Sequence, residues 1–546
     1  MRSTPRSNHV GPTRSYLVGR TSQARQGVML LDVKDLKVQF EHDGETVKAV
    51  NGIDFAINKN EVLGLVGQSG SGKTVTALSV MNLLPRRDCV VCGEIVKNSG
   101  IAMIFQEPFT CLNPVLRVGE QIDEAVLVRR SGSGQSGNSV STRSVRAETF
   151  ALLEKVKLNA PQRIYDSYPH LLSGGQRQRA MIAMALALSP GLLIADEPTT
   201  ALDVTTQAAI LDLILSLKKE LGMSVLFITH DFGIINKIAD RVLVMKDGKI
   251  VERGLKGAVL SSPTADYTKK LLEAVPKLGS TGTGLGQTLY HPDERPVPVV
   301  TVRNLSKTFV LEKGVFKRKA GCIEAVRDVN FEIKEGRTLG IVGESGSGKT
   351  TLAKLLAGLL KADSGSVGIC AREAQIVFQD PYSSLDPRMR MRDIILEGPA
   401  IRGTGKSERE KILQKVLFKV YLNLKDSMKY PHQFSGGQRQ RISLARALAV
   451  KPRILILDEP VSSLDVIIQS EILNLLKDLQ KELALTYVFI SHDLAVVERM
   501  ADDVAVMYKG EIVEFGSRSE IYRSPKHPYT KRLLAGALQS GLHISG

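Results

Sequence analysis

Two glycine-rich stretches have the residue types that could wrap around a phosphate. Gly-Gln-Ser-Gly-Ser-Gly-Lys-Thr occupies residues 67–74, and Gly-Glu-Ser-Gly-Ser-Gly-Lys-Thr occupies residues 343–350. Glycine lets the backbone point its N–H groups at an anion, and a helix that begins there adds partial positive charge. The lysine of each stretch could reach the terminal phosphates of a nucleotide, and the final threonine could bind Mg²⁺. The predicted phosphate-binding residues are Gly67, Gln68, Ser69, Gly70, Ser71, Gly72, Lys73 and Thr74, and Gly343, Glu344, Ser345, Gly346, Ser347, Gly348, Lys349 and Thr350.

The flanking sequence gives each stretch the context that a P-loop requires. Apolar runs precede them at 62–66 and 338–342, and the segment 76–84 after the first has the composition of a helix. Strand, loop and helix in this order favour a nucleotide-binding loop over a chance run of glycines.

Two further apolar runs, 192–197 and 454–459, each end in an acidic pair. A continuous apolar run predicts a parallel strand that is buried on both faces, and its C-terminal end lies where α/β sheets bind ligands. Such a pair could instead cap a helix, but the P-loops favour catalysis. The first acid would hold Mg²⁺ through its water shell, and the second would orient and polarise the attacking water. The candidates are Asp196 and Asp458 for the metal, and Glu197 and Glu459 for catalysis.

All of these motifs belong to one internal repeat. Five short patterns recur in the same order, and the last three, Ser-Gly-Gly-Gln, Asp-Glu and His-Asp, recur 262 residues apart. Such self-similarity predicts a duplicated domain. The other repeated site candidates are Gln106, Ser173, Gly174, Gly175, Gln176 and His230 in the first copy, and Gln379, Ser435, Gly436, Gly437, Gln438 and His492 in the second.

Composition fits a large chain with more than one core. The 546 residues are 43% hydrophobic and 24% charged, and no stretch approaches the ~18 apolar residues of a membrane span. The five cysteines are too few for a disulfide framework, which favours a reducing compartment. The net charge of +16 favours anionic partners: nucleic acid, anionic lipid or phosphorylated ligands.

The sequence divides into four segments. Residues 1–28 are basic, and we expect a disordered tail, or a mis-assigned start with Met29 as the first residue. The two copies of the repeat occupy 29–275 and 298–540, and a Gly/Thr-rich linker at 276–297 joins them. A Ser/Gly-rich stretch at 131–144 is predicted as a surface loop between helices.

These motifs, taken in order, resemble the ATP-binding subunits of ABC transporters, with two nucleotide-binding domains on one chain. The resemblance implies an α/β fold in which each domain has a mixed sheet core, an antiparallel β subdomain and an α-helical subdomain. It also implies a head-to-tail pseudo-dimer, in which the Ser-Gly-Gly-Gln of each copy covers the ATP held by the other copy's lysine. In this family the histidine contacts the γ-phosphate and the catalytic glutamate, the glutamine lies at the Mg²⁺, and an aromatic residue stacks on adenine. Phe40 and Phe309 are the candidates for that stacking.

The resemblance points further to the peptide importers, which take up dipeptides, oligopeptides, glutathione, microcin C or nickel. The residues that suggest this branch are 379–387, 106–114, 430–436 and 524–530, whereas 262–268 is a degraded copy of the last of these. The implied partners are integral membrane permeases and an external solute-binding protein, with no specific nucleic acid. The implied location is the cytoplasmic face of the cell membrane, where a positive charge is favourable.

Two other branches of the family fit less well. Soluble tandem ABC proteins that act on ribosomes or nucleic acid usually have a long charged helical linker, whereas the linker here is short and Gly/Thr-rich. Tandem sugar-importer ATPases fit poorly because both Ser-Gly-Gly-Gln motifs are intact here.

One departure from the family concerns the stretch from Lys73 to Gln106, which is 33 residues and shorter than usual. It predicts a trimmed β-hairpin or a missing piece of the gene.

Overall fold

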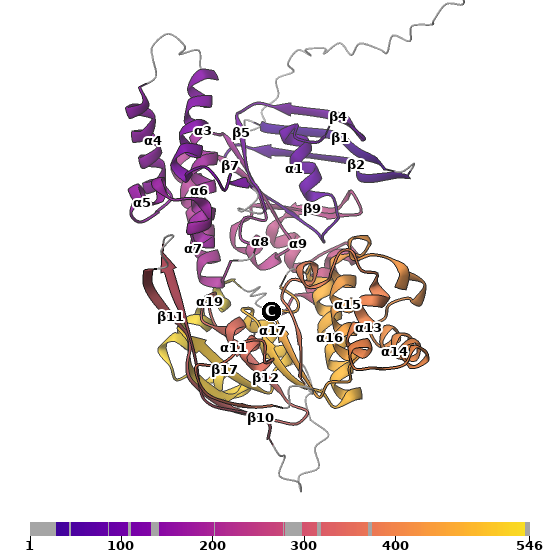
Figure 1. The fold of residues 1–546 in the computed structure, drawn as a ribbon. Helices are drawn as coiled ribbons and strands as arrows, with labels where there is room; N and C mark the ends of the chain where they lie inside the picture. The colour runs from indigo at the N-terminus through magenta and orange to yellow at the C-terminus, as the bar shows by residue number, and fades with distance from the viewer. Residues whose placement is uncertain are drawn as a thin grey trace, which may run out of the picture.

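The computed structural model describes residues 29–42, 45–85, 87–106, 111–132, 141–200, 202–276, 278, 298–313, 318–369, 374–462 and 464–540. The predicted N-terminal tail and nearly all of the predicted linker lie outside these residues. The chain forms two halves of the same architecture, which lie against each other (Figure 1). The predicted α/β class with tandem domains is therefore confirmed.

Each half is built on a six-stranded mixed sheet. The strand order is β5-β6-β7-β3-β8-β9 in the first half and β14-β15-β16-β12-β17-β18 in the second. Only the last strand of each order is antiparallel to its neighbour. The strands are β3 Val62–Val66, β5 Ile101–Ile104, β6 Leu192–Asp196, β7 Ser224–Thr229, β8 Arg241–Lys246 and β9 Lys249–Leu255, then β12 Thr338–Val342, β14 Ala374–Val377, β15 Ile454–Asp458, β16 Thr486–Ile490, β17 Asp503–Tyr508 and β18 Glu511–Ser517.

A three-stranded antiparallel sheet accompanies each main sheet. Its order is β2-β1-β4 in the first half and β11-β10-β13 in the second. These strands are β1 Met29–His42, β2 Glu45–Asn58, β4 Cys89–Lys97, β10 Pro298–Lys313, β11 Arg318–Lys334 and β13 Ser364–Gly368. The short stretch after the first P-loop therefore still completes a sheet, because β4 pairs with β1 from Leu31 to Phe40 before the chain enters β5.

Helices cover the sheets, and one group in each half forms the expected helical subdomain. That group is α3 to α6 in the first half and α13 to α15 in the second (Figure 1). The helices of the first half are α1 Lys73–Met81, α3 Val118–Gly132, α4 Thr142–Lys155, α5 Pro161–Asp166, α6 Gly174–Ala187, α7 Val204–Leu221, α8 Phe232–Ile238, α9 Lys256–Ser261 and α10 Asp266–Ala274. Those of the second are α11 Lys349–Leu356, α12 Pro381–Ser384, α13 Met391–Ile401, α14 Lys406–Lys419, α15 Gly436–Leu448, α16 Val466–Leu483, α17 Leu494–Met500, α18 Arg518–Arg523 and α19 Pro528–Ser540.

Two predicted boundaries differ from the structure. The helix expected at 76–84 spans 73–81, because Asn82 adopts a left-handed conformation with φ 58° that ends it. The loop expected at 131–144 is shorter, since α3 continues to Gly132 and α4 begins at Thr142. Residues 133–140 lie outside the described part of the chain.

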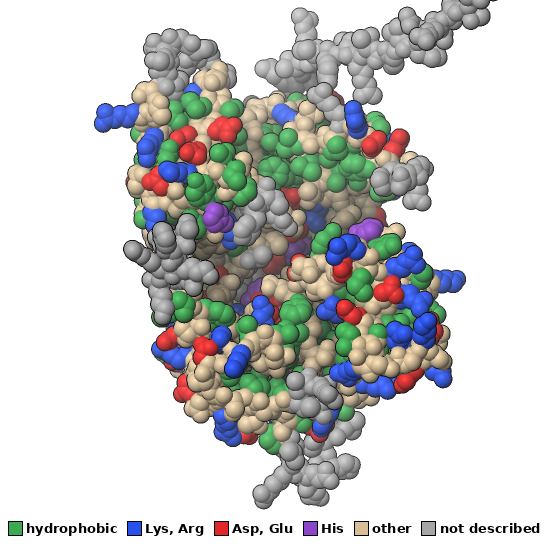
Figure 2. Space-filling model, viewed as in Figure 1, with side chains coloured by type: hydrophobic (Ala, Val, Ile, Leu, Met, Phe, Trp, Pro, Cys, Tyr) green, Lys and Arg blue, Asp and Glu red, His purple; other side chains and the backbone are tan. Residues whose placement is uncertain are grey.

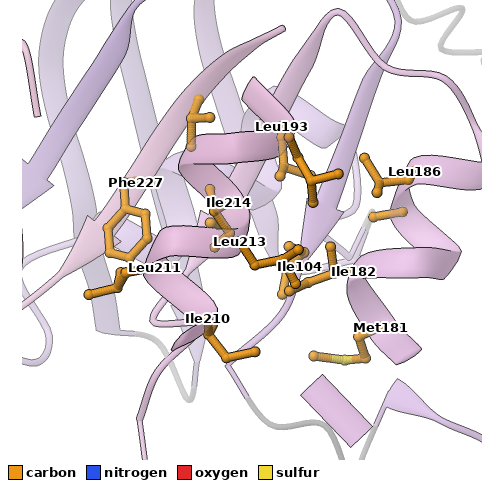
Figure 3. Packing of buried hydrophobic residues seen from close by; sticks show 14 of the residues in the cluster. Ile104, Met181, Ile182, Leu186, Leu193, Ile210, Leu211, Leu213, Ile214 and Phe227 are labelled. Atoms are coloured by element: carbon orange, nitrogen blue, oxygen red, sulfur yellow. The ribbon is translucent and has the colours of Figure 1, made fainter. Parts of the chain in front are cut away.

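The central strands bury side chains on both faces of each main sheet, as a continuous apolar run predicts. In β6, Leu193 packs into the cluster beneath the helical subdomain, whereas Ile194 packs into the cluster beneath the antiparallel sheet. Figure 3 shows the first of these clusters, where Phe227 of β7 and Ile214 of α7 lie with Leu193. This packing fixes the ends of β3, β6 and β7, from which the candidate site residues emerge. Among the described residues, no helix combines the length and apolarity needed to cross a membrane.

Candidate functional site

Both glycine-rich stretches fold as tight loops between a buried strand and a helix. In the first loop Gly70 and Gly72 have φ of 78° and 101°, a backbone region that favours glycine. A Cβ on Gly72 would lie 2.4 Å from the carbonyl oxygen of Ala49, so no larger residue fits there. A Cβ on Gly70 would meet nothing within 4 Å, so the loop is open on that side. The first loop is therefore a cradle with packed walls and one free face.

The P-loop lysines are buried and hold their own loops closed. Lys73 Nζ donates hydrogen bonds to the carbonyl oxygens of Gly67 and Gln68, both at 2.8 Å. Lys349 makes the equivalent pair at 2.7 and 2.8 Å. Burial lowers the pKa of both lysines. An anionic ligand at this point would interact favourably with these buried ammonium groups.

Several buried polar atoms beside the loops have no protein partner. They are the hydroxyl of Ser71, the hydroxyl of Ser347 and the Oδ1 atom of Asp196. Buried polar atoms are normally hydrogen-bonded, so the pair of such atoms at the first loop and the single hydroxyl at the second indicate a ligand site at each loop. Burial raises the pKa of Asp196 to about 6, although the hydrogen bond from Thr74 acts against it. A hydroxyl beside a carboxylate with a free oxygen is the donor set that Mg²⁺ prefers.

The second half presents the same pair of oxygen donors. Thr350 Oγ1 donates to Asp458 Oδ1 over 3.3 Å, and Asp458 is only 1% exposed. Burial raises the pKa of this carboxyl group also. The residues at both loops therefore fit a nucleotide with its magnesium ion.

The second acid of each pair lies in a cluster with the predicted histidine and glutamine. Glu197 Oε1 lies 3.2 Å from His230 Nδ1, and Gln106 Nε2 donates to Glu197 Oε2 over 3.0 Å. In the second half, Glu459 Oε2 lies 3.1 Å from His492 Nδ1 and accepts from Gln379 Nε2 at 2.9 Å. Side chains from three separate chain segments therefore meet at the end of each main sheet.

The backbone of each glutamate is held in an unusual conformation. Glu197 and Glu459 have φ of 45° and 48°, a region that is uncommon for residues other than glycine. Each amide N–H donates to the neighbouring strand at 2.9 Å, to Ile228 in the first half and to Ile490 in the second. A backbone held in a sparsely populated region is a common feature of catalytic positions, because the surroundings must aim one side chain.

The glutamate of the first half is held in its ionised form. Burial acts to raise the pKa of Glu197, but the hydrogen bond and charge of His230, with the charge of Lys73, outweigh it, so the pKa is lowered. Burial acts to lower the pKa of His230, and its contact with Glu197 outweighs that effect, so this pKa is raised. The directions are the same for Glu459 and His492. An ionised glutamate can accept a proton from water, and a protonated histidine can contact a phosphate.

The two Ser-Gly-Gly-Gln motifs begin the helices α6 and α15. Ser173 Oγ accepts a hydrogen bond from Gln176 N at 3.3 Å, and the Gln176 side chain accepts from Ser173 N, which makes a reciprocal cap. Ser435 and Gln438 form the same cap in the second half. Both serines are exposed. These helices therefore present capped N-termini at exposed serines.

The first P-loop contacts the helix that follows the acidic pair of the other half. Gln68 Nε2 donates to Asp465 Oδ1 over 3.3 Å, where Asp465 also caps α16. In the reverse direction, Thr205 Oγ1 of α7 donates to Glu344 Oε1 over 2.9 Å. Figure 2 shows a hollow between the two halves with histidine and charged side chains in its depth.

The two phenylalanines proposed for adenine lie on the antiparallel sheets. Phe40 on β1 pairs with Val47 and packs partly against the core. Phe309 on β10 is 39% exposed, and Lys307 Nζ lies 5.9 Å from its ring centroid. Neither side chain is fully buried, and the adenine contact stays a prediction for both.

Sequence reasoning missed two residues that contact the P-loops. The hydroxyls of Tyr267 on α10 and Tyr529 on α19 accept hydrogen bonds from the backbone N–H of Gln68 and Glu344, at 3.3 and 3.1 Å. These tyrosines belong to the segments 262–268 and 524–530, which the sequence analysis used only as family pointers. The two tyrosines occupy the same place in a repeated motif, and that repetition could have marked them as candidate site residues.

Comparison with known proteins gives two family matches. The family described as ABC transporter matches residues 50–200 and 326–462, and the C-terminal region of oligopeptide/dipeptide transporters matches 251–296 and 513–540. The glutathione import ATP-binding protein GsiA of Salmonella typhimurium (strain LT2) is 43% identical, covering 93% of this chain and 89% of its own length. Its counterpart from Escherichia coli (strain K12) has the same identity and coverage.

One solved structure resembles both halves together. The archaeal ribosome recycling factor aABCE1, solved with the ribosomal stalk protein aP1, matches with a TM-score of 0.61, 20% sequence identity and 92% coverage of both chains. At that identity the likeness concerns the tandem fold alone.

Proposed function

Since this chain belongs to the ABC transporter family and carries two of its ATP-binding domains, we propose that it couples ATP hydrolysis to the import of peptides or glutathione. ATP hydrolysis is the activity of the ABC ATP-binding proteins, and it is the activity of this chain. The substrate class follows from the relatives, which are glutathione importers, and from the peptide-transporter region at the end of each half. The ribosome-directed alternative has only a fold likeness in its favour.

The observation that supports the proposed sites most strongly is the occurrence of the same cluster twice. Each half brings its glutamate within 3.2 Å of a histidine nitrogen and 3.0 Å of a glutamine nitrogen, beside a buried lysine loop. We therefore propose two competent sites, at Lys73 with Glu197 and at Lys349 with Glu459. Mg²⁺ would be held by Thr74, Asp196 and Gln106 in one site and by their counterparts in the other, where it would neutralise phosphate charge.

In each site the chain's own residues prepare a water molecule for attack. The glutamate carboxylate, kept ionised by the neighbouring histidine, accepts a hydrogen bond from that water and withdraws its proton. The glutamine amide donates to this carboxylate and helps to fix its direction. It contacts the oxygen that the histidine leaves free in the first site, and the same oxygen as the histidine in the second. The lysine and the inward N–H groups of the loop bind the phosphates, which lowers the energy of the developing charge.

We further propose that the two halves act as an intramolecular pseudo-dimer. ATP on Lys73 would be covered by Ser435 and its glycines, and ATP on Lys349 by Ser173 and its glycines. Two observations support this head-to-tail arrangement. Each P-loop already contacts the other half, through Asp465 and Thr205, and each motif helix presents an exposed capped N-terminus suited to an anion.

The partners that we propose are membrane permeases with an external solute-binding protein, at the inner face of the cell membrane. The ATP-binding proteins that this chain resembles are import subunits, which require a membrane component to pass the solute. The +16 charge would favour a position under an anionic leaflet.

The test of the sites is the pair of isosteric changes Glu197→Gln and Glu459→Gln in the full chain. If the two sites work independently, each single variant keeps about half of the ATPase rate, and if they alternate each keeps far less. The double variant is expected to lose at least ~100-fold, because a general base contributes about 10²–10⁴ to the rate. Full turnover by the double variant would contradict the assignment.

The test of the solute is uptake by cells of the source organism in which the gene is disrupted. We expect uptake of labelled glutathione or of a labelled dipeptide to fall, and to return with the intact gene but not with the Glu197→Gln/Glu459→Gln form. Unchanged uptake of both solutes after disruption would refute peptide or glutathione import while leaving the ATPase assignment intact.

A further inference from the structure

The C-terminal segment of each half places one tyrosine hydroxyl against its own P-loop. Tyr267 Oη accepts from Gln68 N at 3.3 Å and donates to Gln68 Oε1 at 3.2 Å. Tyr529 Oη accepts from Glu344 N at 3.1 Å. Both N–H groups belong to the residue after the first glycine of the loop, on a turn whose neighbouring carbonyl groups the P-loop lysine holds.

A glutamate of the last sheet strand holds each of these segments in place. Glu252 of β9 accepts from Thr264 N at 2.7 Å and from Ala265 N at 3.2 Å, just before α10 begins. Glu514 of β18 does the same before α19, where it accepts from the amide N–H groups at 526 and 527 at 2.7 and 3.0 Å. The tyrosine hydroxyl is therefore presented by a fixed helix start rather than by a free tail.

The same two helices also touch the opposite half. Helix α10 contacts α16, and α19 contacts α7 and α8. In the first half a chain of hydrogen bonds continues from Tyr267 through the Gln68 side chain to Asp465, which caps α16. In the second half Glu344, whose amide Tyr529 holds, accepts from Thr205 at 2.9 Å. The P-loop, its tyrosine and the other half's helix therefore form one connected contact at each site.

The two tyrosines differ in burial, and the second is the more enclosed. Tyr529 is 4% exposed, its ring centroid lies 4.2 Å from that of Tyr508, and burial raises its pKa to about 12. Tyr267 is partly exposed, and Lys246 Nζ lies 5.1 Å from its ring centroid. Deleting a tyrosine hydroxyl leaves the P-loop N–H without this acceptor, which is costly where the group is buried.

We propose that Tyr267 and Tyr529 are positioning residues that hold the first turn of each P-loop in its phosphate-binding shape and connect that shape to the contact with the opposite half. The inference rests on the ATP sites proposed above. It assigns a role at the ATP site to the C-terminal segment of each half. Neither tyrosine lies in the glutamate–histidine–glutamine cluster, so their removal should weaken nucleotide binding more than it slows the chemical step.

The test removes each hydroxyl while only one site can turn over. Tyr267→Phe is made in the Glu459→Gln chain, which leaves the Lys73 site active, and Tyr529→Phe is made in the Glu197→Gln chain. We expect the KM for ATP of the remaining site to rise about tenfold, the equivalent of ~1.4 kcal/mol, while kcat changes less than about twofold. The unfolding midpoint without nucleotide is measured in parallel.

The matched control is Tyr522→Phe. Tyr522 on α18 donates to the carbonyl oxygen of Leu494 at 2.6 Å, so this change also deletes a tyrosine hydrogen bond, in the same C-terminal region but away from the P-loop. We expect it to lower the unfolding midpoint without raising KM. The proposal is overturned if the tyrosine variants leave KM unchanged, or if Tyr522→Phe raises KM to the same extent. If Glu197→Gln and Glu459→Gln themselves leave hydrolysis intact, the proposed sites fail instead, so the two failures can be told apart.

Discussion

Replacing Gln68 by glutamate should set two carboxylates against each other across the contact between the halves. Gln68 Nε2 lies 3.3 Å from Asp465 Oδ1, and the pair is partly buried. Gln68→Glu has nearly the same shape but exchanges a donor for an acceptor. The second half already carries glutamate at this position, Glu344, so a P-loop tolerates the residue itself.

The expected magnitude follows from the distance. Two unit charges about 4 Å apart repel each other by about 1 kcal/mol in water and about 4 kcal/mol at an effective dielectric of 20. A partly buried pair falls between these limits, so we expect a penalty of about 2 kcal/mol. That penalty shifts an equilibrium between contacting and separated halves by about 30-fold. If ATP binding requires contact, the apparent affinity falls by a similar factor.

The assay is the ATP dependence of hydrolysis in the Glu459→Gln chain at low and high salt. We expect Gln68→Glu to raise KM about 30-fold in ~0.05 M salt. The increase should be much smaller in ~1 M salt, where the Debye length is only about 3 Å and the two charges are largely screened from each other. Asp465→Asn in the same chain should restore KM, because it removes one of the two charges. The control is Glu344→Gln in the Glu197→Gln chain, which should change KM less than about twofold, since the new amide oxygen can still accept from Thr205.

A double-mutant cycle then measures whether residues 68 and 465 interact directly. A coupling of less than about 0.5 kcal/mol between Gln68→Glu and Asp465→Asn, or a KM effect that salt does not reduce, would refute the reasoning that these residues face each other across a working interface.

The remaining predictions concern stability. Gly437→Ala should lower the free energy of unfolding by about 1–3 kcal/mol, because the added Cβ would lie 2.4 Å from Ile468 Cγ2. Gly436→Ala should be tolerated, because the nearest atom to its added Cβ lies at 3.6 Å. Denaturant unfolding of both variants tests this, and equal stability of the two would contradict the packing. Glu252→Gln should lower stability at pH 7 by about 1–2 kcal/mol. Burial acts to raise the pKa of Glu252, but hydrogen bonds such as those from Thr264 outweigh it, so the folded-state pKa is lowered. The stabilisation by the ionised Glu252 is therefore present above the unfolded-state pKa near 4.5 and is lost as pH falls through the lower folded-state pKa. In unfolding curves, the difference in free energy of unfolding between wild type and Glu252→Gln should shrink below about pH 4.5. A difference that stays constant there would contradict this prediction.

Several features of the fold could be predicted because they depend on short-range chemistry. A loop that wraps a phosphate needs glycine at fixed spacing, and a strand buried on both faces needs an apolar run, so both patterns are visible in single segments. The end of α1 was less predictable, because Asn82 adopts a left-handed conformation that composition alone does not indicate. The shortened stretch after Lys73 predicts a trimmed hairpin or a missing piece of the gene. The strand β4 within it still pairs with β1, across one irregularity between Lys34 and Lys37, since pairing depends on backbone geometry more than on residue type.

The sequence alone determined the family, the duplication and the residue types of each site, because these follow from local motifs and their order. Only the tertiary structure decided which residues meet. The contact between Gln68 and Asp465 joins residues 397 positions apart, and that between Gln68 and Tyr267 joins residues 199 apart. Residues so far apart in the sequence come into contact only when two sheets and the helices between them pack together. No local pattern encodes that arrangement, because it is the sum of many weak contacts spread over the whole chain.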